Sequence, residues 1–206
     1  NMGVNALHFE AVSPDLKNLL LQLMKEPRPD GFHLVGGTAL ALRFGHRRSI
    51  DIDLFASEAF NAERITETLE DKYPLEDIVI ETNTVNASIR DIKLDLIAHR
   101  YPLIDQPVTI EGIRMLSLKD LATMKLNAIA NRGSRKDFWD CTELLEHWPL
   151  RELLGYYREK YPHTNIWQVQ KSMCYFDDAE IEPDPIILKR RTWEEVKALI
   201  RQKCQL

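Results

Sequence analysis

The chain has 206 residues, of which 44% are hydrophobic and 29% charged, and its formal net charge at pH 7 is −5. A chain of this length and composition folds into a globular protein with its own core, and its acidity argues against a protein that coats nucleic acid through charge alone. No apolar run approaches the roughly 18 residues of a membrane helix. The start shows no signal-peptide pattern and the three cysteines are widely spaced, so we expect a reduced, cytoplasmic protein.

The first half of the chain alternates between helix and strand patterns. Ser13 is a typical N-cap for a helix that we expect to run to about Lys25. The glycine pair Gly36-Gly37 predicts a tight turn between an apolar strand and a second helix. The elements expected here are helices over 14–25, 38–44 and 62–73, strands over 32–35, 50–55, 78–81, 85–90 and 93–99, and one strand or a hairpin over 108–115.

After Ser117 the pattern becomes helical, and the start resembles a capping box that ends at Asp120. We expect an α+β protein with two domains. The first is an α/β domain over 1–116 with a small mixed sheet, and the second is an all-α domain over 117–206 that closes a cleft. The helices expected in the second half cover 118–131, 135–147, 150–160, 164–174 and 193–203.

Two aspartates alternate with apolar residues in the strand expected over 50–55. Because side chains alternate along a strand, Asp51 and Asp53 share one face, and Ile50, Ile52 and Leu54 share the other. Two neighbouring carboxylates repel each other, and a divalent cation relieves that repulsion. Oxygen ligands of this kind suit Mg²⁺ or Mn²⁺. An exposed polar strand face explains the same pattern, so the pair alone leaves both interpretations open.

The glycine pair lies just upstream of these aspartates. Glycines let a phosphate approach the backbone, and free N–H groups at a helix start favour an anion. Thr38 can add a hydroxyl donor. A plain strand–turn–helix connection is the alternative, and the segment matches neither a P-loop nor a dinucleotide-binding fingerprint.

A third carboxylate, Asp95, stands between two leucines in the strand expected over 93–99. If this strand pairs beside the strand of Asp51 and Asp53, three carboxylates converge, as two-metal nucleotidyl transfer requires. A surface aspartate is the simpler explanation of Asp95 alone. In combination, the three motifs favour a metal site.

These motifs resemble a known family. Residues 35–42 and 48–55, which carry Gly36-Gly37 and the two aspartates, are similar to the AbiEii/AbiGii toxin family within the nucleotidyltransferase superfamily of DNA polymerase β. That family supplies the toxins of type IV toxin–antitoxin and phage abortive-infection systems. In this chain, the helix expected to carry Lys125 and the stretch from Arg135 to Asp140 resemble the C-terminal signature of that family. The resemblance covers nearly the whole chain.

The resemblance implies a polymerase-β-like α/β domain followed by helices, and transfer of a nucleoside monophosphate from an NTP to an acceptor hydroxyl. It implies dependence on Mg²⁺ or Mn²⁺ held by the three aspartates, an acceptor such as RNA or a tRNA 3′ end, and a cognate antitoxin protein. The residues expected to act in catalysis are Asp51, Asp53, Asp95, Lys125 and Asp137, and those expected to bind the nucleotide are Gly36, Gly37, Thr38, Arg48, Ser49 and Lys136.

Two other functions stay open at this point. A phosphatase-type enzyme would use Asp51 as a nucleophile, but Phe55 stands where such enzymes usually have Thr or Val, and the glycine pair would be unexplained. A nucleotide-binding or antitoxin-binding module without catalysis is the second alternative, and the intact carboxylates argue against it.

Overall fold

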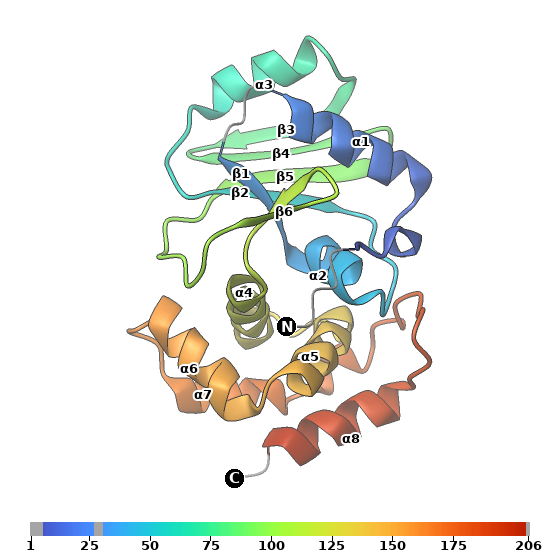
Figure 1. Cartoon of the computed structure of the whole chain (residues 1–206), viewed down its shortest axis with the longest axis vertical. Coiled ribbons are helices and arrows are strands. Elements are labelled where there is room, and N and C mark those ends of the chain that lie inside the picture. The colour runs from blue at the N-terminus through green and yellow to red at the C-terminus, as the bar shows by residue number, and fades with distance from the viewer. Residues whose placement is uncertain (1–5, 27–30, 205–206) are drawn as a thin grey trace.

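The computed structural model describes residues 6–26 and 31–204. The first half contains η1 (Phe9–Ala11), α1 (Pro14–Lys25), β1 (Phe32–Val35), α2 (Gly36–Phe44), β2 (Ile52–Ala56), α3 (Ala62–Glu70), β3 (Leu75–Glu81), β4 (Thr84–Ile89), β5 (Ile92–Ala98), β6 (Val108–Ile110) and β7 (Ile113–Met115). The second half contains α4 (Leu118–Asn131), α5 (Arg135–His147), α6 (Leu150–Lys160), α7 (Ile166–Met173), η2 (Asp177–Ala179) and α8 (Trp193–Cys204). In Figure 1 the sheet occupies one end of the molecule and these later helices the other.

The described strands form one seven-stranded mixed sheet in the order β3-β4-β5-β2-β1-β7-β6. Two neighbouring pairs are parallel, β2 with β5 and β1 with β7. The other neighbouring pairs are antiparallel. This arrangement confirms the expected α+β class with a mixed sheet. The helices of the second half begin only after β7, while the predicted division at 116 stays a prediction.

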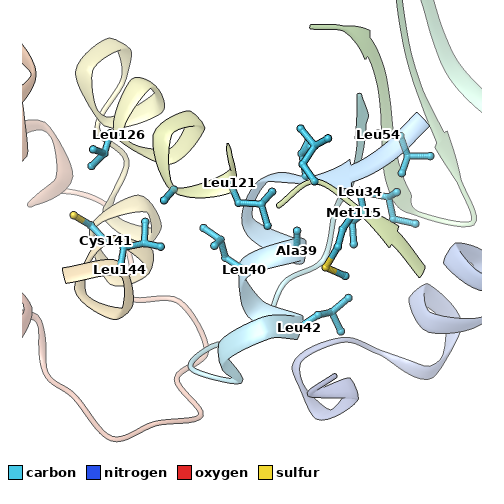
Figure 2. Close-up of a cluster of buried hydrophobic side chains, with 14 of the residues drawn as sticks. Leu34, Ala39, Leu40, Leu42, Leu54, Met115, Leu121, Leu126, Cys141 and Leu144 are labelled. Atoms are coloured by element: carbon cyan, nitrogen blue, oxygen red, sulfur yellow. The ribbon is translucent and has the colours of Figure 1, made fainter. Parts of the chain in front are cut away.

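Helix α2 joins the sheet to the helical half (Figure 1). Its residues from Thr38 to Leu42 are all buried, as expected of a helix that is covered on every side. Figure 2 shows side chains of α2 between those of the sheet and those of α4 and α5. Leu40 lies near Leu121 and Leu144, whereas Leu42 lies on the other side of α2. The core is therefore continuous from the sheet through α2 into the helices.

Several boundaries differ from those expected. The Gly36-Gly37 pair is not a separate tight turn, because α2 already begins at Gly36. Segment 108–115 is the hairpin of the two alternatives, with β6 and β7 turning at Gly112. Strand β3 begins at Leu75, and a register shift next to Asp77 interrupts the apolar alternation that would have revealed its start. Strand β2 begins at Ile52, α3 ends at Glu70 and α7 covers Ile166–Met173, whereas β4, β5 and the end of α8 differ from the expected bounds by one residue.

Because α2 packs between the sheet and the later helices, truncating its buried side chain Leu40 should lower stability strongly. Leu40 is fully buried, so Leu40→Ala should lower the free energy of unfolding by about 2–5 kcal/mol through lost contacts and a cavity. Urea denaturation followed by circular dichroism measures this change. Ile181 is 91% exposed, so Ile181→Ala should stay within about 0.5 kcal/mol of the wild type. Equal effects of the two changes would contradict the assigned packing of α2.

Candidate active site

Every second residue from position 47 to position 55 faces one cavity. The cavity has a volume of about 430 Å³ and lies between the sheet and α4. Before β2, Arg47 forms an isolated antiparallel bridge with Ile187, and exposure alternates from Arg47 to Asp51. The strand alternation therefore begins several residues before β2. The residues of this row are Arg47, Ser49, Asp51, Asp53 and Phe55, and β5 together with the residue after it adds Lys93, Asp95, Ile97 and His99.

The register of β2 and β5 brings the predicted carboxylates together. Asp53 and Asp95 are direct partners across the parallel pair, and Asp51 comes two residues earlier on the same face. Asp95 Oδ1 accepts a hydrogen bond of 2.7 Å from Asn86 Nδ2, and Asp95 Oδ2 lies 2.9 Å from Lys93 Nζ. The three aspartates therefore line the same cavity. The shared face of Asp51 and Asp53 follows from strand alternation, and the position of Asp95 follows from the pairing of β2 with β5.

The charge balance of this group is unfavourable for Asp53. Burial, with repulsion from Asp95 and Asp51, raises the pKa of Asp53 to about 6. A hard divalent cation would relieve this repulsion, so the chemistry of the donor set fits such an ion. Among residues 6–26 and 31–204, however, no three acidic, histidine or cysteine side chains already converge as ligands. Asp95 already contacts Asn86 and Lys93, one through each oxygen, so an ion at Asp95 would share the carboxylate with the Lys93 ammonium.

The glycine pair is required by two side chains of the site. Gly36 has a φ of +72°, and a Cβ there would lie 2.6 Å from Asp53 Oδ2. A Cβ on Gly37 would overlap with Arg47 Nη2. The absence of side chains lets a carboxylate and a guanidinium lie directly against the start of α2. Gly36 and Gly37 both line the cavity.

Two residues expected to bind the nucleotide lie elsewhere. Thr38 is buried, and its hydroxyl contacts Ser49 Oγ at 2.7 Å and donates to the Asp51 carbonyl. Its place is therefore to tie α2 to the segment before β2. Arg48 is exposed and does not line the cavity, because the same alternation that turns Arg47 inward turns Arg48 outward. The backbone N–H of Arg48 is held by the Ile186 carbonyl at 2.8 Å. Arg47, and not Arg48, lines the cavity in this segment.

An ion cluster is made of Arg47, Lys125, Arg132, Asp137 and Asp140. Its three cations line the cavity, and its two carboxylates lie behind them. Arg47 binds Asp140 through two hydrogen bonds of 2.6 and 2.8 Å, and Lys125 Nζ lies 2.9 Å from the same carboxylate. Lys125 Nζ also donates to Asp137 Oδ1 at 2.6 Å, and Arg132 Nε donates to Asp137 Oδ2 at 3.0 Å. Both carboxylates are fully buried, and the surrounding cations hold their pKa values well below the usual range despite that burial.

This cluster changes the interpretation of Lys125. The lysine lines the cavity, but its ammonium is buried and already paired with two carboxylates, which raise its pKa although burial opposes the charge. Asp137 does not line the cavity and holds Lys125 in place. Asp137 also completes the capping box of α5 with Ser134. The cationic side chains of the cavity that are open to solvent are Lys93, Arg132 and Lys136, and Lys136 Nζ lies 3.8 Å from Asp51 Oδ2.

Sequence reasoning missed Arg47, Asn86, Lys93 and Arg132 as members of the site, and also His99 and Tyr161 at its far end. Arg47, Lys93 and His99 could have been found, since each lies an even number of positions from a predicted aspartate along an alternating segment. Asn86, Arg132 and Tyr161 come from elements whose place beside the cavity the sequence does not reveal.

The match to a family model covers this whole arrangement. The family of the nucleotidyl transferase AbiEii toxin, type IV toxin–antitoxin system, matches residues 18–202. The chain belongs to this family. It is 34% identical over 184 residues to an uncharacterized protein of Aquifex aeolicus, which covers 84% of this chain and 85% of that protein. Membership of the AbiEii family makes the protein a nucleotidyltransferase of a toxin family and confirms the resemblance drawn from its motifs.

Solved structures share the fold of this AbiEii protein. MenT4, a nucleotidyltransferase toxin from Mycobacterium tuberculosis, matches with a TM-score of 0.58 and 14% identity over 92% of this chain and 80% of its own. JHP933 from Helicobacter pylori matches with a TM-score of 0.56 and 20% identity over 92% and 87%. Within the described residues, no helix is both long and apolar enough to cross a membrane.

The raised pKa of Asp53 predicts a pH-dependent cost to stability. The fold favours the protonated carboxyl, so the stabilisation is complete below the ordinary value of 3.8 and is lost as the pH rises through about 6. Asp53→Asn keeps the shape without the charge. Without divalent metal, its melting temperature should exceed that of the wild type by roughly 2–6 °C at pH 8 and match it at pH 4. Scanning calorimetry at both pH values tests this, with Asp105→Asn as a surface control, and no gain at pH 8 would refute it.

The pairing of Lys125 predicts that its loss is a structural defect. Lys125→Met removes a cation from the buried carboxylates of Asp137 and Asp140. It should lower the free energy of unfolding by about 3–5 kcal/mol. Lys119, also on α4, makes a surface ion pair with Asp105, so Lys119→Met should cost less than about 1 kcal/mol. Urea denaturation of both variants measures the difference. A fully stable Lys125→Met protein would show that the buried pairs do not hold the fold.

Proposed function

We propose that the cavity binds an NTP together with Mg²⁺ or Mn²⁺ and transfers the nucleoside monophosphate to an acceptor hydroxyl, with loss of pyrophosphate. The observation that carries this proposal is the pairing of Asp53 with Asp95 across β2 and β5, with Asp51 on the same face, beside the start of α2. The family gives the reaction class, and this carboxylate group supplies the place where it would occur.

In this proposal Asp51, Asp53 and Asp95 hold the metal. A divalent ion bound there would offset the charge on the triphosphate and lower the pKa of the attacking hydroxyl. The raised pKa of Asp53 and the ammonium of Lys93 on Asp95 both indicate that this carboxylate group needs positive charge. Asp95 lies next to Asn86, which fixes one of its oxygens, and it would orient the acceptor hydroxyl or accept its proton.

The triphosphate would lie against the start of α2. Gly37 would let a phosphate approach the backbone, and Ser49 would offer its hydroxyl. The start of α2 favours an anion. Lys136 and Arg132 are half-exposed or more and would contact the phosphates directly. Arg47 and Lys125 would act from behind, because their charges are already shared with Asp140 and Asp137.

The biological part of the proposal follows from the family. The type IV toxin–antitoxin family makes a cognate antitoxin protein a reasonable partner, and a hydroxyl of RNA, such as a tRNA 3′ end, a reasonable acceptor. Cytoplasmic localisation would place the enzyme with both. The predicted helical domain over 117–206 would close the nucleotide against the carboxylates through α4.

A labelled-NTP transfer assay on total RNA, with and without Mg²⁺, tests the reaction. The wild type should label RNA only with divalent metal. Asp51→Ala and Asp53→Ala should each lower kcat/KM by a factor of about 10² or more, since they remove charge stabilisation of the transition state.

Asp105→Ala is the matched control, because this exposed aspartate lies outside the cavity and forms a surface ion pair with Lys119. It should keep wild-type transfer. NTP binding without transfer to any acceptor would favour a binding module instead, and undiminished Mg²⁺-dependent transfer by Asp51→Ala would refute the assigned site.

A further inference from the structure

The cavity has a second end that the transfer chemistry does not use. Its wall on α4 runs from Leu121 to Arg132, which is about 16 Å at the helical rise per residue. Arg132 and the ion cluster lie toward the end of α4. At its start, Asp120 binds Lys160, the residue before Tyr161. The carboxylates and open cations thus lie along one part of the cavity, and an aromatic group lies near the other.

This aromatic group consists of Phe55, His99 and Tyr161, which all line the cavity. The rings of Phe55 and His99 have centroids 5.4 Å apart and are inclined by 34°, and those of His99 and Tyr161 are 6.4 Å apart. Phe55 follows Asp53 on the same face of β2, and His99 follows Asp95 and Ile97 on the same face of the strand of β5. A ligand on the carboxylates therefore reaches these rings by extending along the strands.

Two polar atoms of this group have no hydrogen-bond partner. They are His99 Nε2 and Tyr161 Oη, and both are buried among residues 6–26 and 31–204 without a donor or acceptor in reach. Tyr161 is only 6% exposed. Buried polar groups are nearly always paired, so a pair of orphans at the wall of one cavity indicates a ligand that supplies the partners. Of the five such atoms in these residues, the other three belong to residues that do not line the cavity.

The chemistry of the two atoms limits what that ligand is. Burial and the nearby Lys160 ammonium lower the pKa of His99 to about 4, so the imidazole is neutral at physiological pH and has one donor and one acceptor nitrogen. The Tyr161 hydroxyl can donate or accept. A flat, neutral ligand with a polar edge fits the two unpaired atoms. The Lys160 ammonium that acts on His99 is not free for a phosphate, because Lys160 Nζ is already bound to Asp120 and the Pro102 carbonyl.

We propose that His99 and Tyr161 form a nucleobase-recognition pair for the NTP. The base packs against Phe55, and its hydrogen-bonding edge pairs with His99 Nε2 and Tyr161 Oη, while the triphosphate lies at the carboxylate end. This assignment rests on the proposed function, and it makes these two side chains the determinants of which NTP is used. Base selection by hydrogen bonding is effective because the wrong base leaves buried polar groups unpaired.

Tyr161→Phe and His99→Phe test this pair, because each removes polar atoms and keeps an aromatic ring. For wild type and variants, kcat and KM are measured with each of the four common NTPs, and binding of NTP and of inorganic tripolyphosphate is measured by calorimetry with Mg²⁺. We expect each variant to raise KM for the preferred NTP roughly 3- to 10-fold and to flatten the preference among bases. Binding of tripolyphosphate should stay unchanged.

Tyr156→Phe is the matched control, since the Tyr156 hydroxyl contacts Glu152 outside the cavity, and it should keep wild-type preference. Wild-type preference in both Tyr161→Phe and His99→Phe would overturn the pair while leaving the transferase function standing. Equal losses for NTP and tripolyphosphate would also overturn it, since the defect would then not concern the base. If the wild type transfers no nucleotide, the proposed function fails, and a loss of NTP binding without loss of tripolyphosphate binding still supports the pair.

Discussion

The contact between Arg47 and Asp140 sets the position of the carboxylates relative to the helices. Asp140 is fully buried in α5 and accepts two hydrogen bonds from the Arg47 guanidinium. Arg47 lies four residues before Asp51, in the extended segment that continues into β2. Separating the two would leave the buried guanidinium of Arg47 without its carboxylate partner, which costs several kcal/mol. The sheet face that carries the aspartates is therefore tied to α5 and, through Lys125, to α4.

This tie also orders the charges around the cavity. The ion cluster contains three cations and two carboxylates, so it carries one positive charge behind a cavity wall that holds three further carboxylates. Its internal pairs are short and largely buried, whereas Lys93 and Lys136 face the cavity from solvent-exposed positions. The buried charges thus serve the geometry of the site, and the exposed ones remain available to a charged ligand. A lysine of the family signature can be important without touching that ligand.

Much of the site could be predicted because it depends on local alternation. The shared face of Asp51 and Asp53 needs only the period of a strand, and the family resemblance adds Lys125 and Asp137. The direct pairing of Asp53 with Asp95 could not be derived, because the two lie 42 residues apart and their register depends on the whole sheet. Arg47 lies an even number of positions before Asp51, so alternation alone places it on the cavity face and Arg48 on the other. The bridge that holds Arg47 could not be derived, because its partner Ile187 is 140 residues away. Burial of Lys125 likewise depends on α5 and cannot be inferred from α4 alone.

The glycine pair lets a carboxylate lie where the proposed chemistry needs it, although the charge of that carboxylate lowers the stability of the fold. A side chain at Gly36 or Gly37 would overlap with Asp53 or Arg47 at the start of α2. The packing of the protein itself therefore requires the pair, whether or not a phosphate binds there. The positive end of α2 favours the Asp53 carboxylate, yet burial and the two neighbouring aspartates outweigh it and raise the pKa of Asp53. The site therefore holds a negative charge that its buried surroundings disfavour. The buried side chains of α2 compensate, because they anchor the same helix between the sheet and the helical half. A cationic ligand that relieved Asp53 would consequently stabilise the fold through the helix start at which the proposed triphosphate lies.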